Sequence, residues 1–306
     1  MDKLSSENIF TKTFKYVFFK MLMPLAALAV SLIILKIISL AVGGEVNFIA
    51  TLIWAVVTVG LGFGVQFFVG YKFKAYHAAV VTDAVSVGVI PDDMDAMAKE
   101  SLEYRFPTCN DYFLYSRAVK SAMGQIQKDL NTYAENKTSV PVLGQLISLS
   151  KIFVGLALGF TYDLILGYTF WRDGKTLYTS AADGVAIFHN CWKRIATGVL
   201  FVALYIIVGM SVAFLFMGAI GAAMLAPTYG PLAGGLAGVA IGYFVCSAAK
   251  AFIDSRLMIT IMTPFFEEAQ YAEITEEEYG TLYKNYTKYA KLYQKGQSEG
   301  SGNPAA

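Results

Sequence analysis

The stretch of sequence from 46 to 70 contains no charged residue. A helix of that length can cross a bilayer, because a hydrocarbon core of roughly 30 Å needs ~20 helical residues. Further long apolar runs cover 17–42, 195–226 and 232–253. The composition agrees, since 56% of the 306 residues are hydrophobic and 15% are charged, against roughly 25% charged in soluble domains. We therefore predict an all-α fold, a polytopic membrane helical bundle that crosses the bilayer four times.

Short turns join these runs in pairs and give the expected organisation of the chain. The turns at 43–45 and 227–231 connect successive apolar runs, which predicts two transmembrane hairpins accompanied by interfacial amphipathic helices. Apolar and aromatic residues at helical spacing, with charged residues between them, predict cytoplasmic or interfacial helices between and after the hairpins. The expected parts are a lead-in and first hairpin at 1–70, a cytoplasmic or interfacial helical region at 71–140, a re-entrant or in-plane segment with linker at 141–194, the second hairpin at 195–253, and cytoplasmic amphipathic helices with a disordered tail at 254–306.

The distribution of lysine and arginine predicts the orientation. Basic residues are frequent near the N-terminus, in 71–140 and near the C-terminus, whereas the turns at 43–45 and 227–231 have none. Basic segments stay on the cytoplasmic side of most membrane proteins. We expect an integral protein of the cell or plasma membrane with both termini in the cytoplasm.

The segment 141–171 is long enough to cross the bilayer but carries Lys151 and Asp163. An ionisable residue at membrane depth is a candidate functional group. The two residues are more than three helical turns apart, so they can pair only if the segment folds back on itself. The basic residues that follow, Arg172 and Lys175 among them, favour a re-entrant or in-plane segment over a crossing. Alternatively, both charges lie at the water boundary.

Small residues recur at four-residue spacing in the second helix of each hairpin. They are Gly60 and Gly64 in the first, and Gly234, Gly238 and Gly242 in the second. Small side chains let helices approach closely in lipid, where hydrophobic association between helices is weak. The pattern is consistent with packing inside one subunit, with a homo-oligomer contact, or with a hinge between sliding helices.

The C-terminal region has tyrosines and lysines on neighbouring faces of an expected helix, including Tyr283, Lys284, Tyr286 and Lys288. Aromatic and basic residues together are typical of a helix in the headgroup layer of an anionic leaflet. Docking of the same stripe against the helices of 71–140 explains it equally well.

Several classes of chemistry lack a sequence signature. His77 and His189 are the only histidines, and the three cysteines are far apart, which provides no metal-ligand spacing. We identify no catalytic motif and no cofactor-binding motif, so we predict a protein that is not an enzyme. The net charge of +1 is spread along the chain, which argues against nucleic-acid binding. The expected partners are the lipid bilayer, a second copy of the chain in a homo-oligomer, and a cytoplasmic protein.

One stretch is similar to the choline transporter-like family. It comprises Gly174-Lys175 and Thr179-Ser180-Ala181, followed by a spanning helix, a return helix and a closing amphipathic segment. The similarity covers at most a third of the chain, and this chain has fewer crossings than that family. We transfer no site or substrate from it.

Two functions follow as hypotheses. The first is permeation or transport of a small solute or lipid, based on the similar layout of the two hairpins, their glycine-bearing return helices and the charged segment 141–171. The alternative is an assembly or scaffold protein that recruits a cytoplasmic partner through its interfacial helices. A membrane-embedded enzyme acting on lipid has the least support.

Overall fold

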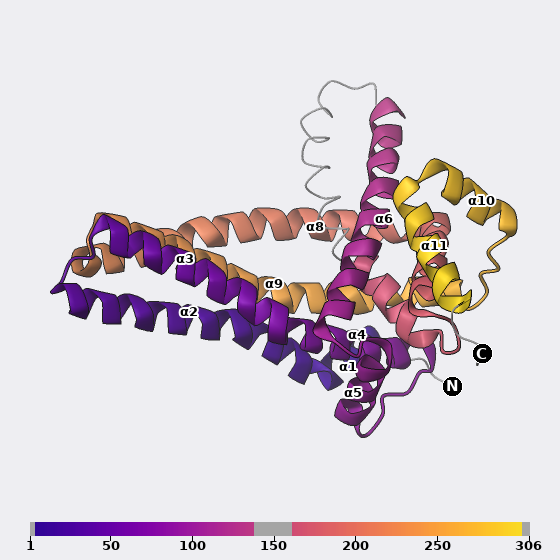
Figure 1. The fold of residues 1–306 in the computed structure, drawn as a ribbon, viewed down its shortest axis with the longest axis horizontal. Helices are drawn as coiled ribbons and strands as arrows, with labels where there is room; N and C mark the ends of the chain where they lie inside the picture. The colour runs from indigo at the N-terminus through magenta and orange to yellow at the C-terminus, as the bar shows by residue number, and fades with distance from the viewer. Residues whose placement is uncertain (1–3, 138–160, 302–306) are drawn as a thin grey trace. The chain divides into compact units, whose positions relative to one another are not determined.

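The computed structural model describes residues 4–137 and 161–301, in which every regular element is a helix (Figure 1). The all-α prediction is confirmed for these residues. Four helical stretches are long and apolar enough to cross a membrane: Phe14–Val42, Phe48–Ser86, Gly209–Tyr229 and Pro231–Ala269. Their exposed faces carry large apolar side chains, such as those of Ile49, Val56 and Phe63. Lipid contact accounts for so much exposed apolar surface, and this supports a membrane location.

The long helices extend beyond the apolar runs of the sequence. Helix α2 (Phe14–Val42) matches its run closely, but α3 (Phe48–Val65) continues through the π-helical turn η1 (Gln66–Gly70) into α4 (Tyr71–Ser86). Helix α8 (Leu177–Tyr229) begins well before its apolar run, and α9 (Pro231–Ala269) ends well after it. Hydropathy detects only the part of a helix that suits lipid. The extensions are amphipathic or buried by protein, so hydropathy does not reveal them.

The chain forms two compact units. The apolar unit comprises residues 14–74 and 205–255, and the polar unit comprises 1–13, 75–204 and 256–306. The five parts expected along the sequence are therefore grouped into two: both predicted hairpins contribute most of the apolar unit, and the remaining parts contribute most of the polar unit.

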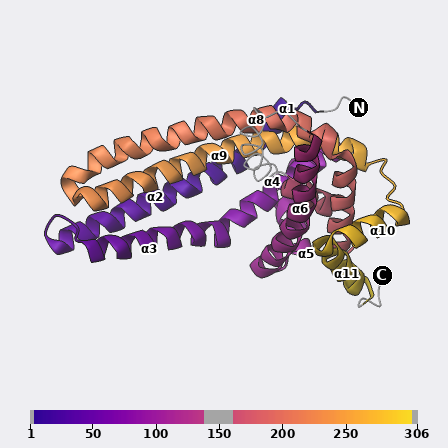
Figure 2. The same ribbon diagram turned by 90° about the horizontal axis from the view of Figure 1, so that it is seen from above.

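In the apolar unit, α2, α3, the later part of α8 and the first part of α9 run side by side (Figures 1 and 2). Gly43 and Gly44 have φ angles of 80° and 133° in the turn after α2, a region that favours glycine. Asn47 then caps α3, because its side chain accepts a hydrogen bond from the amide of Ala50 at 2.9 Å. The turn residue Val46 donates from its amide to the carbonyl of Tyr229 at 3.1 Å. The turn between α2 and α3 therefore lies beside the end of α8.

A tryptophan joins α2 to α3 in the apolar unit. Trp54 is 1% exposed, and its Nε1 donates to the carbonyl oxygen of Ser31 at 2.8 Å. The hydroxyl groups of Ser31 and Thr58 form a second cross-helix hydrogen bond at 2.6 Å. Leu35, Ala233 and Ala237 pack in the same cluster as Trp54, which brings α9 against this pair. Polar groups inside the apolar unit are thus satisfied by one another, as burial requires.

The polar unit is built from shorter helices around an aromatic core. It contains α1 (Ser6–Lys12), most of α4, α5 (Met94–Arg105), α6 (Cys109–Lys137), the first part of α8, the last part of α9, α10 (Glu276–Asn285) and α11 (Thr287–Ser301). Residues 161–171 form a further helix, which is buried from 161 to 169. Tyr115, Tyr162, Tyr168, Phe265 and Phe266 are almost completely buried.

Candidate functional site

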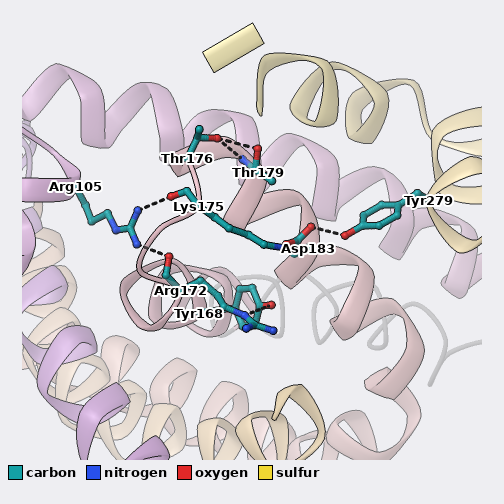
Figure 3. A network of polar contacts seen from close by, with 8 residues as sticks. All are labelled: Arg105, Tyr168, Arg172, Lys175, Thr176, Thr179, Asp183 and Tyr279. Atoms are coloured by element: carbon teal, nitrogen blue, oxygen red, sulfur yellow. Dashed lines mark hydrogen bonds and ion pairs between the residues drawn. The ribbon is translucent and has the colours of Figure 1, made fainter. Parts of the chain in front are cut away.

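The polar unit contains a network of charged and hydroxyl side chains at the start of α8 (Figure 3). Its members come from α5, from 161–171 and the following loop, from α8 and from α10. We define the Asp183 network as these residues: Arg105, Tyr168, Arg172, Lys175, Thr176, Thr179, Asp183 and Tyr279.

Asp183 is a buried carboxylate with partners on both oxygens. Its side chain is 3% exposed, and Oδ2 lies 2.5 Å from the ammonium nitrogen of Lys175. Oδ1 accepts a hydrogen bond of 2.5 Å from the hydroxyl of Tyr279 on α10. Burial of the phenol, together with this bond to Asp183, raises the pKa of Tyr279 well above its ordinary value. A buried carboxylate is tolerated only when it is paired and hydrogen-bonded, so these partners explain how Asp183 is accommodated.

Arg105 caps the helix at 161–171. Its Nη1 donates to the carbonyl of Lys175 at 2.8 Å, and its Nη2 donates to the carbonyl of Arg172 at 2.5 Å. The carbonyl of Arg172 directly follows the helix, where a cation satisfies a free carbonyl and interacts favourably with the helix dipole, and the carbonyl of Lys175 belongs to the loop beyond it. Arg105 thereby fixes the loop that carries Lys175 toward Asp183.

The first turn of α8 receives partners from two directions. Thr176 caps it, because its Oγ1 accepts from the amide of Thr179 at 3.3 Å. The amide of Tyr178 donates to the carboxylate of Glu299 on α11 at 3.4 Å. Helix α11 thus supplies an acceptor for one of the amides that an N-terminal turn leaves free.

Close backbone packing places Asp183 against the aromatic core. Gly184 follows it, and a Cβ there would lie 3.2 Å from Ile165 and from Tyr168. The hydroxyl of Tyr115 bonds to that of Thr169 at 2.6 Å, and burial raises the pKa of Tyr115 well above its ordinary value. These phenols stay protonated at physiological pH, so they act in the core as neutral hydrogen-bonding groups.

The contacts of the Asp183 network stabilise the packing of several helices against one another. The carboxylate of Asp183 is paired with the ammonium of Lys175 and the phenol of Tyr279. The guanidinium of Arg105 donates to backbone carbonyls. Among the described residues, no group of His, Cys, Asp and Glu could hold a metal ion. The arrangement ties α5, 161–171, α8 and α10 together.

Of the two charged residues that the sequence pattern singled out, Asp163 and Lys151, one lies among the described residues. Asp163 lies in the buried helix at 161–171, within the polar unit, and is 6% exposed. That helix is not among the four candidate spans found in the described residues. Lys151 lies outside the described residues, so its pairing with Asp163 stays a prediction.

The five glycines of the sequence pattern occupy two kinds of environment. A Cβ on Gly238 would collide with the carbonyl of Gly218 and the amide of Ala222 on α8, and a Cβ on Gly242 would lie 2.8 Å from the carbonyl of Phe214. A Cβ on Gly234 would likewise collide with the backbone of Ala226. By contrast, Gly60 and Gly64 have nothing within 4 Å of an added Cβ. Of these five glycines, the three on α9 are the ones at a close approach to the backbone of α8.

The C-terminal tyrosine stripe contacts the protein itself. Tyr286 is buried, and its ring lies edge-on to that of His189. The amide of Lys288 donates to the side chain of Gln125 on α6 at 2.8 Å. Tyr283, Lys284 and Lys288 are exposed. The structure thus shows a stripe docked on the protein, with lysines on the open side.

Asp183, Lys175, Arg105 and Tyr279 were not highlighted by the sequence. One signal was present for Asp183, which is the only charged residue between Lys175 and Lys193. A single acidic residue in a largely apolar helix needs a partner. The identity of Tyr279 as that partner follows only from the fold.

The pH dependence of α11 docking provides a test of the first turn of α8. Burial raises the pKa of Glu299, partly offset by its bond to the amide of Tyr178. Because the pKa of this acid is higher in the docked state, docking should weaken as the pH rises through the raised pKa. Glu299→Gln should remove this part of the pH dependence. The test measures thermal unfolding below and above that pKa for the wild type, for Glu299→Gln and for the exposed control Glu276→Gln. Identical pH profiles of the three would contradict the role of Glu299 in the pH dependence.

Comparison with known protein families, characterised proteins and solved structures finds no match to this chain.

Proposed function

We propose that the chain is a multi-pass membrane protein made of two transmembrane hairpins, with both termini and the polar unit in the cytoplasm. The contact between Val46 and Tyr229 supports this arrangement, because it holds the two predicted outer turns together at one end of the apolar unit. The lack of lysine and arginine in both turns supports the orientation.

Within this topology, the protein acts as a membrane-anchored assembly protein that presents the polar unit to a soluble partner. The observation that carries the proposal is the Asp183 network, whose residues all lie outside the four candidate spans and join separate chain segments of the polar unit. The transport hypothesis rests on the similar layout of the two hairpins, their glycine-bearing return helices and the charged segment 141–171; of the two charges in that segment, Asp163 lies among the described residues, in the polar unit.

Permeation of a small solute or lipid is the second candidate. Its support is a set of hydroxyl residues buried in the apolar unit, where Ser31, Thr51 and Thr58 bring polar atoms to membrane depth. A path along them would require α2 and α3 to separate, because Ser31 and Thr58 bond to each other.

The exposed side of α6 allows the two candidates to be distinguished. Leu114 and Arg117 are exposed on this helix, so Leu114→Ser with Arg117→Glu should abolish copurification of a stoichiometric soluble partner without changing thermal stability. The exposed Tyr104 on α5 supplies the matched control Tyr104→Ser. Solute uptake into proteoliposomes by the purified chain, together with unchanged copurification in the α6 variant, would instead support permeation.

A further inference from the structure

The last two helices form a strap over the polar unit. We define the C-terminal strap as residues 276–301, which comprise α10 and α11. On α8 it contacts Asp183 through Tyr279, and Asn190 through Glu278 at 2.9 Å. On α6 it contacts Gln125 through the amide of Lys288. Polar contacts therefore join the strap to two helices.

The buried carboxylate of the docking site keeps its counter-ion when the strap leaves. Asp183 keeps Lys175 as its counter-ion at 2.5 Å, and Lys175 is 45% exposed, so the pair stays in contact with water. The amide of Thr179 keeps its bond to Thr176. Undocking therefore leaves no charge buried without a partner, which would otherwise oppose it strongly.

The strap has two faces of different chemistry. Between Tyr279 and Ser298 the sequence contains four lysines and no acidic residue, and all four lysines are exposed: Lys284, Lys288, Lys291 and Lys295. The docked face buries four apolar or aromatic side chains: Leu282, Tyr286, Tyr289 and Leu292. A helix with an apolar, aromatic face and a lysine-rich face has the two properties that bind an anionic lipid surface.

We propose that the C-terminal strap exchanges its docking site on α6 and α8 for an anionic lipid surface. The lysines attract the strap to acidic headgroups, and undocking then releases Tyr286, Tyr289 and their apolar neighbours for insertion among the lipids. The attraction weakens with salt, because charges on a surface are screened beyond roughly 10 Å at 0.1 M ionic strength. The lipid composition thereby controls whether the face of α6 and α8 beneath the strap is covered. This inference does not depend on the identity of any protein partner.

A glycine in the strap provides a variant that opens it. A Cβ on Gly296 would lie 2.6 Å from the backbone nitrogen of Thr179 and 2.9 Å from its Cα. Backbone atoms cannot rotate away as a flexible side chain can, so Gly296→Leu should undock α11. Gly300→Leu is the matched control in the same helix, because the nearest atom to a Cβ there is a methyl carbon of Thr176 at 4.0 Å.

Fluorescence energy transfer between two exposed positions reports docking. Cysteines at Ser121 on α6 and Gln297 on α11 are labelled with a donor and an acceptor, after Cys109, Cys191 and Cys246 are replaced. The full chain is placed in nanodiscs of phosphatidylcholine, or of equal parts phosphatidylcholine and phosphatidylserine. Vesicles of the same two compositions are then added, so that the strap can reach anionic lipid in its own bilayer or in another.

We expect high energy transfer with phosphatidylcholine alone and a loss of transfer when phosphatidylserine is present. The triple variant Lys284→Gln/Lys288→Gln/Lys291→Gln should stay docked, with an affinity for anionic lipid lower by on the order of 100-fold. Gly296→Leu should show low transfer in every lipid, and Gly300→Leu should behave as wild type. Unchanged transfer of the wild type in phosphatidylserine, or an equal response of the triple variant, would overturn the proposal.

Discussion

Lys175→Met is expected to destabilise the polar unit by about 2–3 kcal/mol. The substitution leaves the carboxylate of Asp183, which is 3% exposed, with the hydrogen bond from Tyr279 but without its counter-ion. Breaking a buried ion pair by removing one partner costs about 3–5 kcal/mol in general. We place the effect below that range because Lys175 is 45% exposed, and water screens its attraction to Asp183.

A double-mutant cycle separates the ion pair from other effects of these substitutions. Asp183→Ala should cost less than Lys175→Met, because the lysine it leaves can be solvated. The double variant should be more stable than the sum of the two single effects predicts, by about 1 kcal/mol or more. The stability of the polar unit is measured for all three variants by thermal unfolding of the purified full chain. Strict additivity would show that Lys175 and Asp183 do not stabilise each other.

Gly238→Leu should separate α8 from α9 and destabilise the apolar unit by about 3 kcal/mol. A Cβ at Gly238 would collide with backbone atoms of Gly218 and Ala222, and no rotamer change can relieve such a contact. Tight packing replaces hydrophobic association as the main drive for helix pairing in lipid. The loss should therefore appear as reduced thermal stability of the apolar unit and as increased proteolysis near Pro231.

Gly235→Leu is the control for this prediction. Gly235 lies in the same helix, and nothing lies within 4 Å of a Cβ built on it. Gly60→Leu in α3 supplies a second open position. Both controls should unfold within a few degrees of wild type. A Gly238→Leu variant as stable as these controls would mean that the close contact between α8 and α9 does not hold the apolar unit together.

The four candidate spans could be predicted because lipid imposes a simple requirement on sequence. The uncharged residues 46–70 satisfy it without reference to any other part of the chain. Hydropathy does not indicate where a helix ends when its last part is buried in protein. Helix α9 continues to Ala269 through Asp254 and Arg256, because Met262, Phe265 and Phe266 are buried in the polar unit.

The contacts of the Asp183 network could not be predicted from local sequence. Lys175 is eight positions before Asp183, but the loop held by Arg105 decides that the two meet. Tyr279 is farther still, 96 positions along the chain. Asp163 lies in a helix that is buried from 161 to 169, within the polar unit, and its position at membrane depth or at the water boundary stays a prediction. A buried protein core and lipid select the same apolar residues, so hydropathy cannot separate them.

The most direct test of the four-span account is cysteine labelling in intact cells. Single cysteines are placed at Tyr229 and Asp173 in a chain without Cys109, Cys191 and Cys246. The side chain of Asp173 is 87% exposed, so a cysteine there is accessible to a reagent on its own side of the membrane. The account predicts that a membrane-impermeant maleimide labels Tyr229→Cys in intact cells and labels Asp173→Cys only after permeabilisation. Labelling of Asp173→Cys in intact cells would contradict it.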